Sequence, residues 1–580
     1  MSRRRSLPNR DRKVQRFFPS RLDLINVMVL LFLAVLSWLP RGQGEIDLRV
    51  DAGVYYVLGT SLADGHGYRL PNEPGNIRAT QYPPLVPAII ALQQKLDRTT
   101  DPALMRKHVK RVWLLFLLLF TGLAYCVLRS SCSVAWSFLG VTFCLLNTQL
   151  CFYSIQATAE LPFAVISLLF VLLFRKDSRR EGLTSVMGIA AFLSRTIGIA
   201  LLAAWIADAV LRKEVLRAAL RSSIAIACVL AWASYIHFVE SSPEYKRPSY
   251  AYQRAGYLFY NVSYAKNVVY KDPFRPELGF ASFKDRLKGF FKNTVAVPSS
   301  TGEAATSYSN LWEAGASSIN GKLGFVFFPP SLVPAIMFAV GCCVLAGMGV
   351  LLCRQEWFLA LYIFFTILIS CCAPWQQISR YLVPIAPLLV FSLFTFIEWL
   401  SGITCIKANN RRLLVLRSAM YVAVVFAISL QASSYFLSHF RYSQLQSSFE
   451  GSGNMLRFRQ FLYRTQDVEL EDATTWIRGH ARPSDILAAA MPQWVYLNTG
   501  RRTVMPPLES EPQKEESFLR SVPVRYLIVE SSSKMGDSAR NHVLPMLQRF
   551  ASHWPRVYAS TGGNVQVYEN LSGGLEGKPQ

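Results

Sequence analysis

Residues 49–87 read RVDAGVYYVLGTSLADGHGYRLPNEPGNIRATQYPPLVP and follow the first apolar run of the chain. This segment contains a carboxylate at Asp51, a helix-spaced aromatic segment that includes Tyr55, the sequence GHGYR around His66, and Tyr82 followed by two prolines. A simple connection between two apolar runs needs none of these features. We therefore expect residues 49–87 to form part of a functional site.

The composition indicates a membrane protein. The 580-residue chain is 52% hydrophobic and only 17% charged, whereas soluble domains carry about 25% charged residues. Several apolar runs reach the roughly 20 residues that a helix needs to cross a bilayer. The sequence therefore predicts an α-helical polytopic membrane protein. The net charge of +24 does not indicate nucleic-acid binding, because Lys and Arg cluster at the ends of apolar runs, where they orient helices against anionic lipid.

The cysteines argue against a disulfide framework. There are 11 of them, an odd number, and all lie between Cys126 and Cys405, mostly within apolar runs. No C-x-x-C or His/Cys spacing indicates a zinc site. The adjacent pairs at 342–343 and 371–372 fit small apolar side chains in helices.

The basic clusters give the expected topology. Residues 1–21 form a basic tail that we expect in the cytoplasm, and the first span lacks a signal-peptide cleavage site. Arg195 interrupts the apolar run 183–211, whose two flanks are both basic. Two short spans with Arg195 at the outer turn place both flanks in the cytoplasm. About eleven spans are expected, at 22–40, 111–128, 133–151, 159–174, two within 183–211, 217–239, 331–353, 356–373, 381–400 and 413–436.

These spans define a membrane domain over residues 22–440, with outer loops at 41–110 and 240–330. In the second loop, residues 280–297 alternate phenylalanines with lysines at helical spacing, which predicts either a helix lying in the membrane interface or an ordinary packing helix.

Residues 441–580 differ in composition from the membrane domain. Short apolar runs at 486–490, 526–529, 557–560 and 565–568 alternate with helix-like stretches at 472–480 and 537–550, which predicts a soluble extracytoplasmic α/β domain.

Four charged residues lie at the predicted outer ends of spans, namely Asp51, Glu160, Arg195 and Arg380. Ionisable groups at membrane depth are costly and tend to be functional. We expect these residues to converge on an extracytoplasmic site for an anionic lipid headgroup, with Asp51 as a catalytic base. Tyr381 follows Arg380 directly and belongs to the same expected site, as do Tyr55, Tyr82 and His66.

Each of these residues also has a simpler interpretation. Asp51 could cap a helix over 52–63, although Val54 stands where a capping box would have Glu or Gln. Glu160 could cap its span or pair with an arginine. Arg195 and Arg380 could be interface anchors whose charged ends reach water. His66 could shape a turn between its two glycines, and the prolines after Tyr82 stiffen the chain in either case.

The ordered motifs resemble those of the GT-C glycosyltransferases. The resemblance rests on D-x-x-x-Y-Y…S-L-A-x-G-H-G-Y-R…Y-P-P-L-x-P in the first outer loop, then A-E-L-P-F, F-L-S-R and R-Y-L-V-P-I-A-P at span ends. More narrowly, the chain is similar to the dolichyl-phosphate-mannose-protein mannosyltransferase and aminoarabinose transferase group, in a bacterial form. The run T-T-W-I-R…P-x-D-I-L…W-V-Y-L-N-T-G-R-R is similar to the extramembrane domain of bacterial members. One departure is Ala52, where many members have Glu.

The resemblance implies a GT-C-like fold and an inverting transfer of a sugar from a polyprenyl-phosphate donor to a lipid, glycan or protein acceptor. Asp51 would be the general base, while Arg195 and Arg380 would neutralise the leaving phosphate. No cofactor is expected, although Asp51 and Glu160 could share a divalent ion. The expected location is a bacterial inner membrane, with the site on the periplasmic side. A lipid or polysaccharide flippase and a non-catalytic scaffold protein remain as alternatives.

Overall fold

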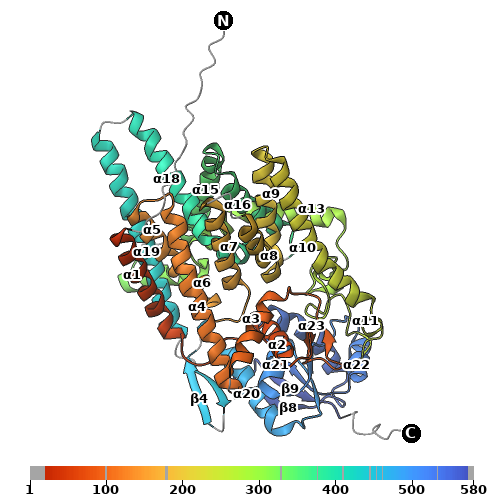
Figure 1. Ribbon diagram of the computed structural model, residues 1–580. Helices are drawn as coiled ribbons and strands as arrows, with labels where there is room; N and C mark the ends of the chain where they lie inside the picture. Colours follow the sequence, from red (N-terminus) through yellow and green to blue (C-terminus); the bar gives the residue numbers. More distant parts are fainter. Residues whose placement is uncertain are drawn as a thin grey trace.

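The computed structural model describes residues 20–571, except 98, 100, 177–180, 327–328, 375–376, 408–409, 443–445, 452–453, 460 and 532. The expected basic tail at 1–21 therefore lies outside the described residues apart from Ser20 and Arg21. Figure 1 shows a helical part with the C-terminal strands and helices, drawn in blue, packed against one end of it.

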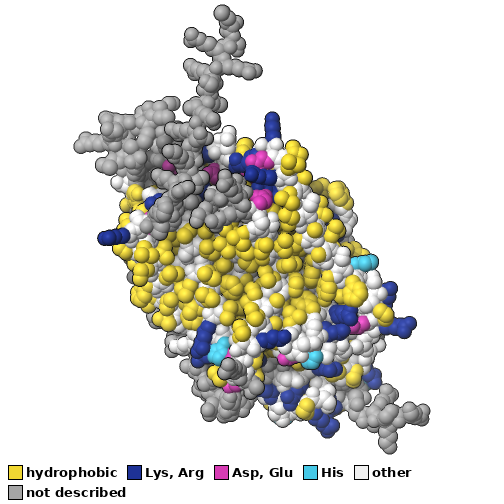
Figure 2. Space-filling view, in the orientation of Figure 1, with side chains coloured by type: hydrophobic (Ala, Val, Ile, Leu, Met, Phe, Trp, Pro, Cys, Tyr) yellow, Lys and Arg dark blue, Asp and Glu magenta, His cyan; other side chains and the backbone are white. Residues whose placement is uncertain are grey.

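The helical part has the character of a multi-span membrane protein, as the composition predicts. Among the described residues, five helical segments are long and apolar enough to cross a bilayer: Arg21–Arg41, Pro102–Arg129 (α4), Val215–Ser241 (α10), Leu332–Cys353 (α15) and Ile378–Ser401. Shorter apolar helices, including α16 (Trp357–Cys372), pack between them. On the face shown in Figure 2, hydrophobic side chains form a broad band with Lys and Arg along its borders. This is the surface that a lipid bilayer requires.

The expected span 133–151 is broken into two helices. Helix α5 (Val134–Leu145) ends before Asn147, whose side chain accepts hydrogen bonds from the amides of Gln149 and Leu150 and so caps α6 (Thr148–Tyr153). The Asn147 side-chain amide also donates to the carbonyl of Ala304 at 2.9 Å. A continuous helix through 133–151 was therefore a wrong prediction, because a tertiary contact stabilises the break.

The run 183–211 forms two helices, as Arg195 predicts. Helix α8 (Glu181–Ser194) and α9 (Ile199–Leu211) are joined by the 3-10 turn η3 (Thr196–Gly198), which begins directly after Arg195. A Cβ on Gly198 would lie 2.6 Å from the Ala191 carbonyl, so only glycine allows the two helices to approach this closely. Arg195 therefore lies at the turn between them.

The amphipathic segment of the second loop forms a helix that is exposed at its start and packed at its end. Helix α13 (Phe283–Ala305) exposes Phe283 and Phe291 in its first half. Its second half packs against α15 so closely that a Cβ on Gly302 would overlap the carbonyl of Met337. The second half of α13 is therefore a packing helix of the bundle, whereas a place in the membrane interface for its first half stays a prediction.

The C-terminal region has the strands and helices of the predicted α/β domain, and its sheet is mixed. Five strands, β5 (Ile486–Ala488), β6 (Thr503–Val504), β7 (Val524–Val529), β8 (Arg556–Ala559) and β9 (Gln566–Glu569), form the order β6-β5-β7-β9-β8. Strands β5, β6 and β7 are parallel, whereas β9 is antiparallel to β7 and β8. Helices α20 (Thr465–His480), α21 (Pro492–Thr499), α22 (Pro512–Ser521) and α23 (Lys534–Arg549) accompany them. Before this sheet, β3 (Gln446–Gly451) and β4 (Asn454–Arg459) form an antiparallel hairpin.

The first outer loop joins the two parts of the molecule. Its helix α2 (Asp51–Ala63) lies beside α21 (Figure 1). Arg106 of α4 bonds Glu45 at 3.0 Å and donates to the carbonyl of Leu497. Asn72 pairs with edge strand β6, since its carbonyl accepts from the Thr503 amide at 2.8 Å and its side chain donates to the Thr503 carbonyl at 3.1 Å. These contacts hold α4 and the loop after α2 against the C-terminal domain.

Candidate functional site

Asp51 is the first residue of α2, and its side chain does not cap the helix. The N-cap position is held by Val50, whose φ of 54° and ψ of −125° belong to the first central residue of a type II′ turn. The Ala52 amide closes this turn on the Arg49 carbonyl at 3.3 Å. The Asp51 carboxylate instead faces other elements, so the capping interpretation was wrong.

Arg380 joins the two acidic residues of the expected site. This arginine lies on the short helix α17 (Ile378–Leu382), directly before the turn η5 (Val383–Ile385) and the long helix α18 (Ala386–Lys407). Its Nη2 donates to Asp51 Oδ2 at 2.5 Å, and its Nε donates to Glu160 Oε1 at 2.7 Å. The Asp51 side chain keeps 13% of its exposure, so the carboxylate is reachable from solvent.

Arg195 completes a chain of four charges. Glu160 opens α7 (Glu160–Lys176) and is buried, and its Oε1 lies 3.1 Å from Arg195 Nη2. The Arg195 guanidinium also stacks on the Tyr381 ring at 4.8 Å from its centroid. Its Nη1 is buried with no hydrogen-bond partner among the described residues. This leaves one donor that an anionic ligand can use.

Tyrosines surround the Asp51 carboxylate. The hydroxyls of Tyr82 and Tyr260 both donate to Asp51 Oδ1, at 3.0 Å and 3.1 Å. The Tyr55 ring packs against the Tyr82 ring at 4.7 Å, and Tyr264, in the short helix α12 (Tyr264–Asn267), packs edge-on against Tyr82 at 5.8 Å. Burial raises the pKa of both Tyr82 and Tyr260 well above the ordinary value of 10. Both hydroxyls are therefore protonated donors.

Sequence reasoning did not identify Tyr260. The available signal was the density of tyrosines in the second outer loop, at positions 245, 250, 252, 257, 260, 264 and 270. Most of them bind elsewhere, for example Tyr252 to the Met505 carbonyl and Tyr257 to Glu509. Composition alone could not separate Tyr260 from its neighbours.

No protein-family model and no curated protein sequence matches the chain, but solved structures do. The crystal structure of the Archaeoglobus fulgidus oligosaccharyltransferase tethered with an acceptor peptide superposes with a TM-score of 0.52 at 11% identity, over 94% of this chain and 74% of that one. The same archaeal enzyme, AglB, in complex with an inhibitory peptide and a dolichol-phosphate gives a TM-score of 0.51 at 11% identity, over 95% and 75%. ArnT from Cupriavidus metallidurans bound to undecaprenyl phosphate gives 0.45 at 11% identity, over 96% and 99%.

The chain has a GT-C-like fold. This confirms the expected fold class, namely a helical multi-span membrane protein with a C-terminal mixed sheet. The similarity is one of fold alone, because the identity to each of these structures is close to 11%. Within this GT-C-like fold, the structure brings together Asp51, Glu160, Arg195, Arg380 and Tyr381, with Tyr55 and Tyr82 beside them.

His66 lies apart from this cluster. It follows the C-terminal end of α2, a helix of 13 residues and about 20 Å in length, whereas Asp51 stands at the other end. His66 is exposed and lines a separate polar cavity of about 610 Å³, together with Asp64 and with Tyr496 and Arg502 of the C-terminal domain. Its sequence position near Asp51 did not predict this, because the helix between them carries it away.

The hypothesis of a divalent ion shared by Asp51 and Glu160 does not fit the arrangement. The Arg380 guanidinium binds both carboxylates and so occupies the position of a bridging cation. Among the described residues, no group of three or more His, Cys, Asp or Glu side chains is suited to hold a metal. The site of this GT-C-like chain is therefore described by its acidic residues, arginines and tyrosines.

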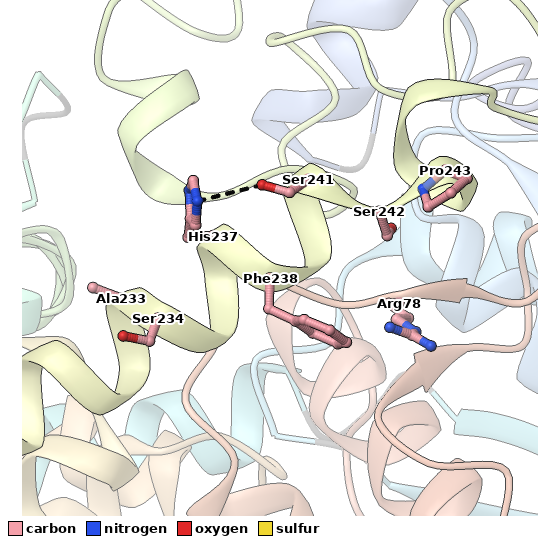
Figure 3. Close-up of a pocket in the computed structure, with 8 residues that line it drawn as sticks. All are labelled: Arg78, Ala233, Ser234, His237, Phe238, Ser241, Ser242 and Pro243. Carbon is pink, nitrogen blue, oxygen red and sulfur yellow. Dashed lines mark hydrogen bonds between the residues drawn. The ribbon is translucent and has the colours of Figure 1, made fainter.

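A groove of about 770 Å³ opens at the end of α10, on the side of the C-terminal domain. Figure 3 shows its lining, with Phe238 and His237 from α10 and Arg78 from β2 (Ile77–Arg78). Phe238 is 63% exposed, and the Arg78 guanidinium lies 5.5 Å from its ring centroid. Arg78 also lies 3.5 Å from Glu244. Because Tyr82 follows Arg78 by only four positions, their Cα atoms are at most about 14 Å apart.

Proposed function

We propose that the protein is a membrane glycosyltransferase that moves a sugar from a polyprenyl-phosphate donor to an acceptor hydroxyl. The observation that carries this proposal is the bridge that Arg380 makes between Asp51 and Glu160, with Arg195 beside it. This network places an accessible carboxylate beside two guanidinium groups. The network lies at the end of the helical part that faces the C-terminal domain. The GT-C-like fold and the dolichol-phosphate bound by the archaeal oligosaccharyltransferase support the same class of donor.

In the proposed reaction, the acceptor oxygen attacks the anomeric carbon of the donor sugar. Asp51 takes the proton of the acceptor hydroxyl as the new carbon–oxygen bond forms. The bond between the anomeric carbon and the phosphate oxygen breaks, and the phosphate leaves with the electron pair. A single displacement of this kind inverts the anomeric centre. Arg380 and Arg195 stabilise the charge on the leaving phosphate.

Arg380 connects donor binding to the activity of the base. Its Nη2 is bonded to Asp51 in the structure. A phosphate at this position competes for the guanidinium, since bidentate Arg–phosphate contacts are strong. Loss of the contact with Arg380 leaves Asp51 Oδ1 bonded to two tyrosine hydroxyls and frees Oδ2 to accept the proton of the acceptor hydroxyl. The base is then fully available only when the donor is present.

We place the prenyl chain of the donor in the groove of Phe238 and Arg78. The groove lies at the end of a helix that can span the membrane, and exposed Ile226, Leu230 and Phe238 line one side of that helix. The segment from Arg78 to Tyr82 connects this groove to the tyrosines at Asp51. On this proposal the protein resides in a bacterial inner membrane with the site facing the periplasm.

The test is transfer by the purified protein in vesicles that contain a labelled polyprenyl-phosphate sugar, with released polyprenyl phosphate as the readout. Asp51→Asn should insert normally and lose about 10²–10⁴-fold in rate, the usual contribution of a general base. Asp64→Asn, at the opposite end of α2, is the matched control and should remain active. Movement of the labelled lipid across the bilayer without cleavage would indicate a flippase instead, and binding without either outcome would indicate a scaffold.

A further inference from the structure

The short segment that carries Asp51 is held by the C-terminal domain. Arg49 lies between two carboxylates, with its Nη2 2.8 Å from Asp47 and its Nη1 2.9 Å from Asp467 in the first turn of α20. The Arg49 guanidinium also stacks on Tyr463, 5.0 Å from the ring centroid. Asp467 is only 3% exposed. A buried charge network of this kind has a well-defined geometry, because leaving a member unpaired is costly.

The next residue, Val50, has a strained backbone. Its φ of 54° lies in a region that β-branched residues rarely adopt, at a cost of about 1–3 kcal/mol. Such a conformation persists only where the surroundings enforce it. Val50 is 37% exposed, so much of the constraint comes from its neighbours in the chain. Arg49 precedes Val50 and is held by its ion pairs. The first turn of α2 follows Val50 and is held by its packing.

Helix α21 of the C-terminal domain covers that first turn. A Cβ on Gly53 would lie 3.3 Å from Cβ of Gln493 and 3.4 Å from the amide nitrogen of Trp494. The same atom would lie 2.8 Å from the carbonyl oxygen of Leu48. Glycine at this position therefore allows α21 to lie directly on the backbone of α2, two residues after Asp51.

The segment also orders the approach to Glu160. The Asp47 amide donates to the Ile155 carbonyl at 2.8 Å, and the Ala157 amide donates to the Asp47 carbonyl at 3.2 Å. Residues 155–157 lead directly into α7, which Glu160 opens. The position of Asp47 and Arg49 therefore affects both carboxylates that Arg380 joins.

We propose that the C-terminal domain sets the position of the catalytic carboxylate, and that Asp467, acting through Arg49, is a positioning residue for Asp51. This inference rests on the proposed role of Asp51 as the base. The domain is then part of the catalytic apparatus and more than a binding module attached to it. Removal of the Asp467 charge leaves Arg49 paired with Asp47, so the variant Asp467→Asn is expected to fold.

The experiment compares Asp467→Asn with Arg106→Gln in the full-length protein. Arg106 also joins the membrane domain to the C-terminal domain, through Glu45 and Leu497, but does not contact residues 47–53 through those bonds. Asp467→Asn should lower kcat about 10–100-fold, because small displacements of reacting groups have effects of this size. Its KM for the donor should stay within about twofold, since the arginines are unchanged. Arg106→Gln should retain kcat, and Asp467→Glu should recover most of the lost rate.

Hydrogen exchange gives a readout that does not depend on activity. Amides of residues 50–55 should exchange faster in Asp467→Asn than in the wild type or in Arg106→Gln. Unchanged kcat and unchanged exchange in Asp467→Asn, with Asp51→Asn inactive, would overturn the positioning role while leaving the proposed function intact. An active Asp51→Asn protein would instead overturn the function, whereas the exchange result would still decide whether Asp467 orders this segment. Equal losses of kcat in Asp467→Asn and Arg106→Gln would indicate general domain docking and overturn the specific role of Asp467.

Discussion

Arg380 Nη2 lies 2.5 Å from Asp51 Oδ2, an ion pair between residues 329 positions apart in the chain. The same guanidinium holds Glu160 through its Nε at 2.7 Å. A planar fork with several donors can hold two acidic groups and still exchange one of them for a phosphate. The ion pair between Arg380 and Asp51 therefore links two distant parts of the chain. It is also the contact that a bound donor phosphate would replace.

Arg380→Lys should lower kcat/KM about 10²–10³-fold, because a single ammonium cannot replace a forked contact to a developing phosphate charge. The KM for the donor should rise more than the KM for the acceptor. Arg354→Lys is the matched control, since Arg354 forms a comparable ion pair with Glu398 outside the site, at 3.0 Å. Steady-state kinetics with each substrate varied in turn measures the effect. Equal increases in both KM values would assign Arg380 a structural role.

Tyr260→Phe should lower kcat about fivefold, the effect of removing one hydrogen bond of about 1 kcal/mol from the Asp51 carboxylate. Tyr257→Phe serves as the control, because its hydroxyl bonds Glu509 at 3.2 Å. Loss of activity in the control to the same extent would show that the loop, rather than the bond to Asp51, matters.

The pH profile tests the same tyrosines. Burial raises the pKa of Tyr82 and Tyr260, so the neutral, donating form persists above pH 10. Neither tyrosine should therefore contribute an alkaline decline in kcat between about pH 7 and 9.5, where ordinary tyrosine is still mostly neutral. The wild type and Tyr260→Phe should show the same alkaline limb. A decline that Tyr260→Phe abolishes would contradict this prediction.

Glu515→Gln should stabilise the C-terminal domain at neutral pH. Burial raises the pKa of Glu515 well above its ordinary value of 4.5, and its Oε1 has no hydrogen-bond partner among the described residues. The folded state binds the proton more tightly, so stability is greatest below pH 4.5 and falls as pH rises toward the folded-state pKa. The substitution should increase the free energy of unfolding by about 1–3 kcal/mol at pH 7 and make it less dependent on pH. Thermal unfolding at several pH values compares the stability of the wild type, of Glu515→Gln and of the exposed control Glu511→Gln. A Glu515→Gln variant less stable than the wild type at pH 7 would contradict the prediction.

Phe238→Ser should raise the donor KM about tenfold with little change in kcat, because it removes about 1.5 kcal/mol of apolar contact from the proposed prenyl groove. Phe238→Leu keeps an apolar side chain and should stay close to the wild type. With a donor that has a short prenyl chain, Phe238→Ser and Phe238→Leu should have the same donor KM. An unchanged KM in Phe238→Ser would remove the groove from donor binding.

Much of the architecture could be predicted from periodicity and charge. The apolar runs located the long helices, and the basic flanks of 183–211 correctly indicated a reversal at Arg195. Alternating short runs located β5, β7, β8 and β9. These features depend on local composition, which hydropathy and positive-charge bias report directly.

Features that depend on tertiary contacts were not predictable in this way. The break at Asn147 needs the carbonyl of Ala304, which belongs to a helix more than 150 positions later. The burial of the second half of α13 needs the glycine contacts with α15. The partners of Asp51 include one residue that could be predicted and one that could not. Arg380 was expected from its place at a span end, whereas no signal in the sequence distinguished Tyr260 from the tyrosines around it.

The pairing of Asn72 with Thr503 has a consequence for the separated C-terminal domain. Strand β6 is the outermost strand of the sheet, and the first loop of the membrane domain supplies the hydrogen bonds along its free side. A fragment expressed without the membrane domain would present that unpaired edge to water, and exposed edges recruit strands from other molecules. Such a fragment should self-associate, and a short peptide carrying the loop around residue 72 would be a rational solubilising additive.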